Sequence, residues 1–291
     1  MGQFSYGAHG FNNKYRRAGE VELQQKQALY HAQVHDRGAS NLHYAGVIAW
    51  CAFEYGSLLG AYRGVKYPGV ADVFRVPKLG ASFYRAQVDP KQRAVIEPNF
   101  YWDFGASTPS GPGKGALIFS NLQRLELLIN GKLHSVVNPD REGFPHTKYP
   151  PFLVDLAIDG SAKPELRING YSGGALILSR SFSSDPASDQ LVLQVDDSEI
   201  FNDGSDATRL VFRVVDKFGA PRLFAGGLVT VSIAGPGVIV GDNPFDLTES
   251  GGGGAVWIKA KPGSRGRIRV FAHHVSLGSR SVEINIRGIV R

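Results

Sequence analysis

The sequence is poor in residues that form covalent or redox-active links. Cysteine occurs once in 291 residues, as Cys51, and methionine occurs once, as Met1. A single cysteine excludes an intrachain disulfide, so stability must come from a hydrophobic core, which a chain of this length can bury. Cys51 stands inside the apolar run Val47 to Phe53, where we expect a small buried hydrophobe without redox chemistry.

Long apolar stretches and a targeting segment are also lacking. No run approaches the length needed to span a bilayer. The N-terminus, Met1 to Gly7, has neither the basic nor the apolar region of a signal peptide. We therefore expect no membrane segment and, for the chain as it stands, a cytoplasmic location, although a longer parent protein could be exported.

Charge is dispersed rather than concentrated. The formal net charge is +6, and 32 basic residues are interspersed with 26 acidic ones. The longest basic cluster, Arg265, Arg267 and Arg269, alternates with glycine and apolar residues, which is typical of the solvated face of a strand. This pattern disfavours a nucleic-acid partner.

Glycine and proline are abundant, with 36 and 16 residues, as in a turn-rich protein of two or three folded units. Helical patterning occurs only in residues 1–90. There, Glu20 to His35 contains no glycine or proline and predicts a helix, and Leu79 to Gln87 predicts a short one. Between them, Ala45 to Phe53 is apolar at nearly every position, which predicts a parallel strand buried on both faces. Residues 1–90 are therefore expected to form a partial α/β unit.

Beyond residue 90 the pattern changes to short β runs separated by turn residues. Residues 91–183 and 190–291, joined by a polar linker, each predict an immunoglobulin-like β-sandwich. Asn130-Gly131 predicts a hairpin turn with positive φ at both residues. The four glycines 251–254 lack the lysine and Ser/Thr of a phosphate-binding loop and predict a flexible loop. The predicted strands are 95–98, 116–120, 124–129, 132–136, 152–156, 165–169, 175–181, 190–195, 208–215, 228–233, 255–260, 267–272 and 281–286.

Several motifs in residues 1–90 occur in a fixed order. They are Tyr6-Gly7-Ala8-His9, His31-Ala32-Gln33-Val34, Ala45 to Tyr55, and Gly69 to Lys78, which has the form G-x-x-D-x-x-R-x-P-K. Together they resemble the end of the catalytic barrel of glycoside hydrolase family 2, which includes β-galactosidases, β-glucuronidases and β-mannosidases. The later parts resemble the immunoglobulin-like domains that follow that barrel. The resemblance implies that residues 1–90 are the C-terminal segment of a (β/α)8 barrel, and that the partner is a carbohydrate, a β-galactoside-like glycan.

The same resemblance locates the catalytic positions. The family nucleophile is a glutamate just before an aromatic-Gly-x-His sequence, and Ser5 stands there, while the acid/base glutamate falls upstream of residue 1. A retaining glycosidase needs two carboxyl groups about 5 Å apart, one that attacks the anomeric carbon and one that protonates the leaving oxygen. A serine hydroxyl does not replace the attacking carboxylate. We therefore expect no catalytic residue in this chain and no hydrolysis by it alone.

Trp50, His9 and Glu54 are the candidate substrate-binding residues. By resemblance, Trp50 forms the floor of a sugar subsite, and a core aromatic is an equally good interpretation of the sequence. Glu54 follows the same expected strand, where a lone glutamate is more typical of a hydrogen-bonding residue than of a catalytic one.

No metal or cofactor is expected. His31 and His35 are spaced i and i+4 on the predicted helix, but the glutamate of a zinc-binding HExxH motif is missing between them. The acidic residues Asp203 and Asp206 resemble a calcium loop in their density, and a turn is the favoured interpretation.

We expect the chain to be the C-terminal part of a retaining family 2 glycosidase. One alternative is a non-catalytic carbohydrate-binding or scaffolding protein, for which Tyr101, Trp102 and Phe104 would form a sugar platform, although packing between the first two parts is favoured for these rings. Another is one half of a split glycosidase that associates with an N-terminal barrel half. An incomplete barrel would expose Val47 to Phe53, which favours self-association.

Overall fold

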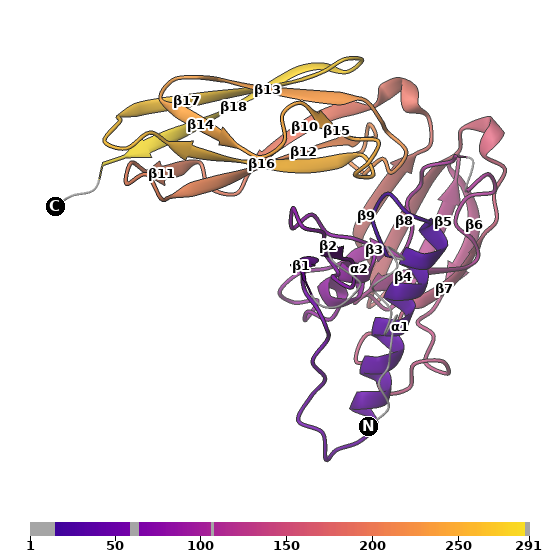
Figure 1. Ribbon diagram of the computed structural model, residues 1–291. Helices are drawn as coiled ribbons and strands as arrows, with labels where there is room; N and C mark the ends of the chain where they lie inside the picture. The colour runs from indigo at the N-terminus through magenta and orange to yellow at the C-terminus, as the bar shows by residue number, and fades with distance from the viewer. Residues whose placement is uncertain (1–14, 59–63, 106–107, 289–291) are drawn as a thin grey trace. The chain divides into compact units, whose positions relative to one another are not determined.

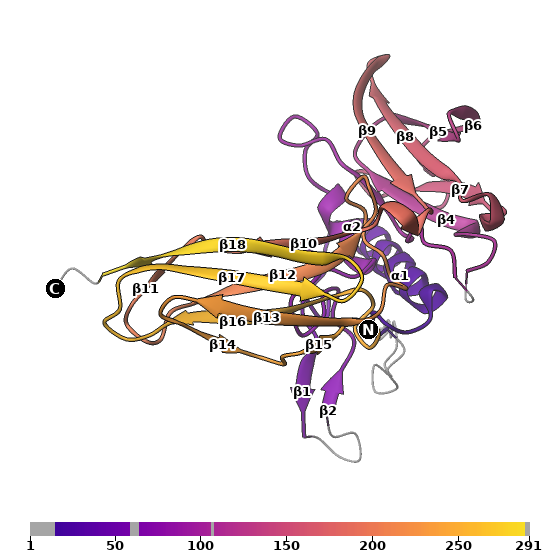
Figure 2. The ribbon, with the colours of Figure 1, turned by 90° about the horizontal axis from the view of Figure 1, so that it is seen from above.

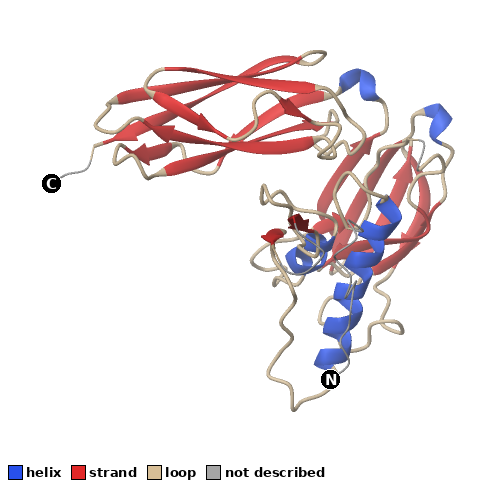
Figure 3. Ribbon diagram, viewed as in Figure 1, coloured by secondary structure: helices blue, strands red, loops and turns tan. Residues whose placement is uncertain are grey.

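The computed structural model of the 291-residue chain describes residues 15–58, 64–105 and 108–288. The chain clusters into two compact units, a first unit that ends at Asp185 and a second unit that begins at Pro186. Strands predominate in both, and the two α-helices found among the described residues belong to the first unit (Figure 3). The β-rich character expected beyond residue 90 is confirmed.

The two helices of the first unit are α1 (Val21–Ala39) and α2 (Gly80–Ala86), and both helix predictions are confirmed. The small residues Ala28 and Ala32 of α1 are buried in the same cluster as Phe83 of α2. A smooth alanine surface lets two helices approach closely and share one core. Within the described residues, neither helix is long and apolar enough to cross a membrane.

The run from Ala45 to Phe53 does not form the buried strand that its sequence predicts. It is an irregular loop in which Ile48 and Trp50 are 99% and 67% exposed. Only its last residues are tied down, for example by the hydrogen bond from Ala71 N to Ala52 O (2.9 Å). A parallel strand needs hydrogen-bonding neighbours and cover on both faces. The described residues supply neither beside the first half of this run, so the strand prediction is wrong for the structure of this chain.

Cys51 is half-buried rather than part of a core, because the loop around it is open. The loop leads into a small antiparallel hairpin, β1 (Tyr55–Ser57) with β2 (Gly64–Lys66). The prediction of a core position for Cys51 therefore fails together with that of the strand.

The remaining strands of the first unit form two sheets, with the orders β3-β4-β7 and β6-β5-β8-β9 (Figure 1). Leu125 and Leu127 of β5 and Ile168 of β8 are fully buried, and they alternate with more exposed residues as a half-covered sheet requires. Every strand predicted between residues 95 and 181 is present. The bounds are β3 (Ile96–Pro98), β4 (Gly113–Ser120), β5 (Arg124–Ile129), β6 (Lys132–Val137), β7 (Phe152–Leu156), β8 (Glu165–Ser172) and β9 (Ala175–Ser183).

The hairpin between β5 and β6 turns at Asn130 and Gly131, whose φ angles are 50° and 78°. Both angles are positive, as the Asn-Gly prediction requires. The turn pairs Ile129 with Lys132. Asn130 is also fixed from outside the hairpin, since its side-chain oxygen accepts a hydrogen bond from Glu165 N (2.8 Å).

The second unit also consists of two sheets, with the orders β10-β12-β16-β14 and β11-β18-β17-β13-β15. Figures 1 and 2 show the long β17–β18 hairpin running along one of its layers. Arg267 and Arg269 of β17 are exposed and alternate with buried Ile268 and Val270, which confirms the solvated face. The strands are β10 (Gln190–Val195), β11 (Glu199–Phe201), β12 (Ala207–Val215), β13 (Leu228–Ala234), β14 (Gly237–Val240), β15 (Phe245–Asp246), β16 (Gly253–Ala260), β17 (Gly266–His274) and β18 (Gly278–Arg287).

The glycine run 251–254 is not the flexible loop that its composition predicts. Gly251 and Gly252 make a turn, and Gly253 and Gly254 begin β16 in buried positions. A Cβ at Gly254 would lie 2.3 Å from the ring of Phe245. The glycines therefore permit close packing inside the second unit.

The aromatic residues after β3, among them Tyr101 and Trp102, pack inside the first unit. The sequence favours this packing over a sugar-binding platform. Trp102 is 3% exposed, and its Nε1 donates to Pro164 O (2.8 Å). The hydroxyl of Tyr101 donates to Gln24 on α1 (3.3 Å). These rings thus join the helical segment to the sandwich.

Asp36 near the end of α1 makes a second connection to the sandwich. Its Oδ1 accepts hydrogen bonds from His146 N (2.8 Å), Thr147 N (2.8 Å) and Thr147 Oγ1 (2.9 Å). Asp36 and Thr147 are both buried. One carboxylate oxygen therefore orders the loop between β6 and β7 against the helix.

We expect Asp36→Ala to destabilise the first unit by about 2 kcal/mol, because the change leaves buried donors without their charged acceptor. Urea denaturation would measure this loss, and the transition of the second unit should not move. Asp155→Ala is the matched control, since Asp155 Oδ1 accepts a hydrogen bond from the exposed amide of Ala157 (3.1 Å). Equal losses in the two variants would contradict the role of Asp36.

Candidate functional site

Trp50 is presented by the open loop that follows α1. Its indole Nε1 donates to the hydroxyl of Tyr55 (3.2 Å), and the two rings are perpendicular, with centroids 6.0 Å apart. The same segment exposes several other large apolar side chains. They are Leu42, Tyr44, Ile48, Phe53, Tyr55 and Leu58. An exposed aromatic ring of this kind can pack against an apolar partner or stack on the CH groups of a sugar.

A cavity of about 760 Å³ lies between α1 and this loop. Its lining includes Trp50, Tyr44 and Ile48 from the loop and His31 and His35 from the helix. The volume falls in the usual range of sites for small ligands. Among the sequence candidates, Trp50 lines this cavity and Glu54 does not. Ser5 and His9 lie outside the described residues.

His31 and His35 share one hydroxyl group. His31 Nδ1 lies 2.7 Å from Tyr84 Oη, and His35 Nε2 lies 3.1 Å from the same oxygen. Burial lowers the pKa of His31 to about 4, with smaller contributions from His35 and Lys78, and burial also lowers the pKa of His35. Both rings are therefore neutral at pH 7. The cavity thus offers two neutral imidazoles and the cation Arg37 beside an aromatic ring.

Glu54 lies in a buried ion pair. Lys78 Nζ donates to Glu54 Oε1 (2.6 Å), and the two side chains are 0% and 3% exposed for lysine and glutamate respectively. Lys78 also donates to the carbonyls of Tyr15 (2.7 Å) and Tyr67 (3.2 Å). Burial raises the pKa of Glu54, and the ammonium of Lys78 opposes that rise.

A second buried ion pair stands beside the first. Arg17 Nη2 donates to Asp72 Oδ2 (2.8 Å), and Asp72 Oδ1 accepts from Val76 N (2.8 Å). Both ion pairs involve the G-x-x-D-x-x-R-x-P-K motif: Asp72 is its aspartate, and Lys78 is its last residue. Its arginine, Arg75, has a positive φ of 59° within the turn that Asp72 closes. The motif therefore orders the chain around Glu54, a role that the sequence indicated only through its fixed spacing.

No group of His, Cys, Asp or Glu side chains suited to a metal ion occurs in the described residues. Asp203 Oδ1 accepts from the backbone amides of Ser205 and Asp206, both at 2.7 Å. That loop is a turn closed by its own carboxylate, as favoured from the sequence.

Lys78→Met should cost about 4 kcal/mol of stability at pH 7, because it leaves the Glu54 carboxylate buried and unpaired. The loss should shrink at about pH 5. Burial raises the pKa of Glu54 in the folded state, so the folded variant binds that proton more tightly than the unfolded chain does. Denaturant unfolding at the two pH values measures both effects.

Arg85→Met is the control for this change, since Arg85 pairs with Glu97 at 3.7 Å and is 43% exposed. Exposed pairs contribute about 1 kcal/mol or less. A loss in Lys78→Met that did not vary with pH would show that Glu54 is not the group left unpaired.

Known proteins resemble this chain over most of its length. Residues 191–283 match the family described as glycoside hydrolase family 2 C-terminal domain 5. A β-galactosidase of Thermoanaerobacter pseudethanolicus (strain ATCC 33223 / 39E) is 34% identical over 280 residues, which are 90% of this chain and 36% of the relative. A β-galactosidase of Thermoanaerobacterium thermosulfurigenes is 29% identical over 256 residues, 83% of this chain and 35% of the relative. The chain thus spans about a third of the length of these curated relatives.

Solved structures share the fold. A β-glucuronidase from glycoside hydrolase family 2 superposes with a TM-score of 0.67 at 19% identity, over 92% of this chain and 28% of that one. A β-glycosidase from Bacteroides vulgatus gives 0.66 at 16% identity, over 87% and 32%. The matched domain, the β-galactosidase relatives and the shared fold together support this chain as a C-terminal portion of a glycoside hydrolase family 2 protein.

Proposed function

We propose that the protein to which this chain belongs hydrolyses terminal β-galactosides with retention of configuration, through a covalent glycosyl-enzyme intermediate. The support is the similarity to β-galactosidases, at 34% identity over 90% of the chain in one of them. In this proposal the chain is the C-terminal part of that enzyme and contributes one wall of the sugar site.

The observation that carries the proposal is the placement of Trp50. Its side chain is 67% exposed and lines a cavity that also contains neutral histidines and Tyr44. A flat aromatic face with the neutral histidines and the donor groups of Arg37 around it suits the CH groups and hydroxyls of a hexose. Trp50 is therefore the proposed floor of the sugar subsite, and His9 is assigned to the same subsite from its motif.

Glu54 would act on this subsite indirectly. Glu54 lies four residues after Trp50 in the chain, and its carboxylate accepts a hydrogen bond from Lys78. The pair fixes the end of the loop, so it would limit the positions that Trp50 can adopt. We propose a positioning role in substrate binding for Glu54 and no catalytic role.

Residues 1–90 would be the end of a (β/α)8 barrel, followed by immunoglobulin-like sandwiches in 91–183 and 190–291. The exposed apolar side chains of the loop, above all Leu42 and Ile48, are what a barrel strand would cover with its neighbours. The proposed partner for this surface is the N-terminal barrel half. In its absence the surface would favour self-association.

The chain would be inactive alone. The nucleophile position holds Ser5, and retention requires two carboxyl groups placed on either side of the anomeric carbon. The alternative of a non-catalytic carbohydrate-binding protein loses its proposed platform, since Trp102 is buried. A split glycosidase remains compatible with the proposal, because its second half would cover the same loop.

We expect no hydrolysis of 4-nitrophenyl β-galactoside by the purified chain or by Ser5→Glu, because one added carboxylate does not complete the pair. Turnover should appear when the chain carrying Ser5→Glu is fused to the upstream two-thirds of the Thermoanaerobacter pseudethanolicus relative, because the fusion then has a carboxyl group at the nucleophile position as well as the upstream acid/base glutamate that the resemblance implies. In that fusion, Trp50→Ala should lower kcat/KM by about tenfold or more, a loss typical of one removed stacking contact.

Phe218→Ala is the control in the fusion, because Phe218 is an exposed aromatic of the second unit. Turnover by the unfused chain would contradict the proposal. An active fusion whose kcat/KM did not change on Trp50→Ala would contradict the assignment of Trp50 to the sugar subsite.

The chain alone should form oligomers in solution, driven by the exposed loop. Leu42→Ser combined with Ile48→Ser should shift it towards monomer, because the two side chains are 98% and 99% exposed and removing them costs no core packing. Size-exclusion chromatography with light scattering measures the mass. Leu133→Ser, at an exposed position of β6, is the control, and a monodisperse monomer of the unmodified chain would contradict the prediction.

A further inference from the structure

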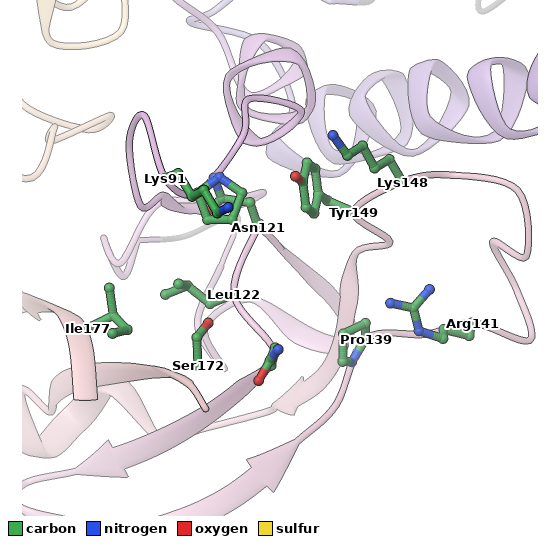
Figure 4. A pocket seen from close by; sticks show the side chains of 11 residues that line it. Lys91, Asn121, Leu122, Pro139, Arg141, Lys148, Tyr149, Ser172 and Ile177 are labelled. Atoms are coloured by element: carbon green, nitrogen blue, oxygen red, sulfur yellow. The ribbon is translucent and has the colours of Figure 1, made fainter. Parts of the chain in front are cut away.

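A second cavity, of about 510 Å³, opens on the sandwich of the first unit. Its walls come from the loop after α2, the turn between β4 and β5, the loop between β6 and β7, and the β8–β9 hairpin. Figure 4 shows Lys91 on one flank, Lys148 and Arg141 on the other, and Tyr149 between them. Segments far apart in the sequence therefore bring three cations to one hollow.

None of the described residues that line this cavity carries a carboxylate. Within the described part of the chain, Lys91, Arg141 and Lys148 form no ion pair. Three carboxylates are near these cations in sequence and none of them lines the cavity: Asp89 Oδ1 accepts from Lys91 N (2.9 Å), Asp140 Oδ1 accepts from Gly143 N (2.9 Å), and Glu142 is exposed. The cavity therefore has a local positive charge, although basic residues elsewhere are interspersed with acidic ones.

Hydrogen bonds fix the walls of the cavity. The buried side chain of Asn121 donates to the carbonyls of Val88 (2.9 Å) and Arg93 (2.8 Å), which holds the basic loop after α2 against the turn after β4. Gln87 Nε2 donates to Tyr149 O (3.0 Å) and holds the loop before β7 in the same way. The backbone of the walls is thus held in place before any ligand binds, which reduces the entropic cost of binding to the ordering of the exposed cationic side chains.

The lining combines charge with apolar and neutral polar groups. Leu122, Pro139 and Ile177 supply apolar surface, and Tyr149 supplies an aromatic ring, with Lys148 Nζ 5.1 Å from its centroid. Gln123 and Ser172 supply neutral polar groups. A bare inorganic anion would not use the apolar walls, and a sugar ring would, through its CH groups. The cations match a carboxylate or a sulfate on that ring, since arginine binds such groups through two parallel hydrogen bonds.

We propose that this cavity binds an anionic oligosaccharide, one whose sugar rings carry carboxylate or sulfate groups. Arg141 and Lys148 bind the anionic groups from one flank, Lys91 binds from the other, and Tyr149 packs against the ring between them. The site lies outside the Trp50 cavity and does not depend on the proposed hydrolysis. It would allow the chain to hold an acidic glycan while a terminal sugar is processed elsewhere.

Calorimetric titration of the full 291-residue chain tests the site. The probes are α-1,4-linked trigalacturonate and neutral α-1,4-galactotriose, which differ only in their carboxylates, together with a sulfated galactan tetrasaccharide. We expect trigalacturonate or the sulfated probe to bind about tenfold or more tightly than galactotriose, and binding to weaken as salt is raised. The anion that binds more tightly identifies the group that the cations recognise.

Arg141→Glu combined with Lys148→Glu should weaken that binding about tenfold or more, and Tyr149→Ala should weaken it at unchanged charge. Lys132→Glu combined with Lys114→Glu is the matched control, since both lysines are exposed in the same unit and do not line the cavity. Equal binding of the neutral and acidic probes, no binding of either acidic probe, or equal losses in the control would overturn the proposal. Equally tight binding of oligoglutamate would also overturn it, because only charge would then be recognised.

Discussion

The arrangement of the chain before α2 depends on two buried ion pairs, Lys78–Glu54 and Arg17–Asp72. Removing charges from water costs several kcal/mol per ion, so such pairs add little net stability, but separating the partners is strongly unfavourable. Lys78 also donates hydrogen bonds to the carbonyls of Tyr15 and Tyr67. Its ammonium group therefore links three segments of the chain, around Tyr15, Glu54 and Tyr67. Specificity of arrangement, more than stability, is what these charges provide.

This constraint explains why Trp50 is presented and not buried. The loop is fixed where Ala52 and Glu54 bond the segment around Ala71, and it is open before that point. Exposed apolar side chains then precede the fixed end, with Ile48 at 99%. A partner that covered them would gain about 25 cal/mol for each Å² of apolar surface removed from water, at the cost of ordering a loop. The anchored end reduces that cost, because only the first half of the loop has to be ordered.

Local patterns in the sequence predicted the sandwich strands well and the chain before residue 90 less well. Asn130-Gly131 determines its own turn, so no distant residue was needed to predict it. The strand prediction for Ala45 to Phe53 is wrong because an apolar run indicates only that a segment is suited to burial. Strand formation also requires a neighbouring strand to hydrogen-bond with. The short strands β11, β14 and β15 were missed, since two to four residues carry little pattern. The basic cavity could not be predicted at all, because Lys91 and Lys148 meet only through tertiary packing.

The two cavities differ in the way they would recognise sugar. Around Trp50 the histidines are neutral, Arg37 is the one charged side chain among the described residues of the lining, and one wall is an open loop. The cavity beside Tyr149 is charged and is held by side-chain hydrogen bonds from Asn121 and Gln87. Because the backbone of its walls is held within one unit, the charged cavity would bind a ligand without a partner chain, and its electrostatic field would attract an anion before contact. In the two proposals, the sandwich would hold an acidic glycan, and the aromatic cavity would determine which sugar is processed once a partner covered its open loop.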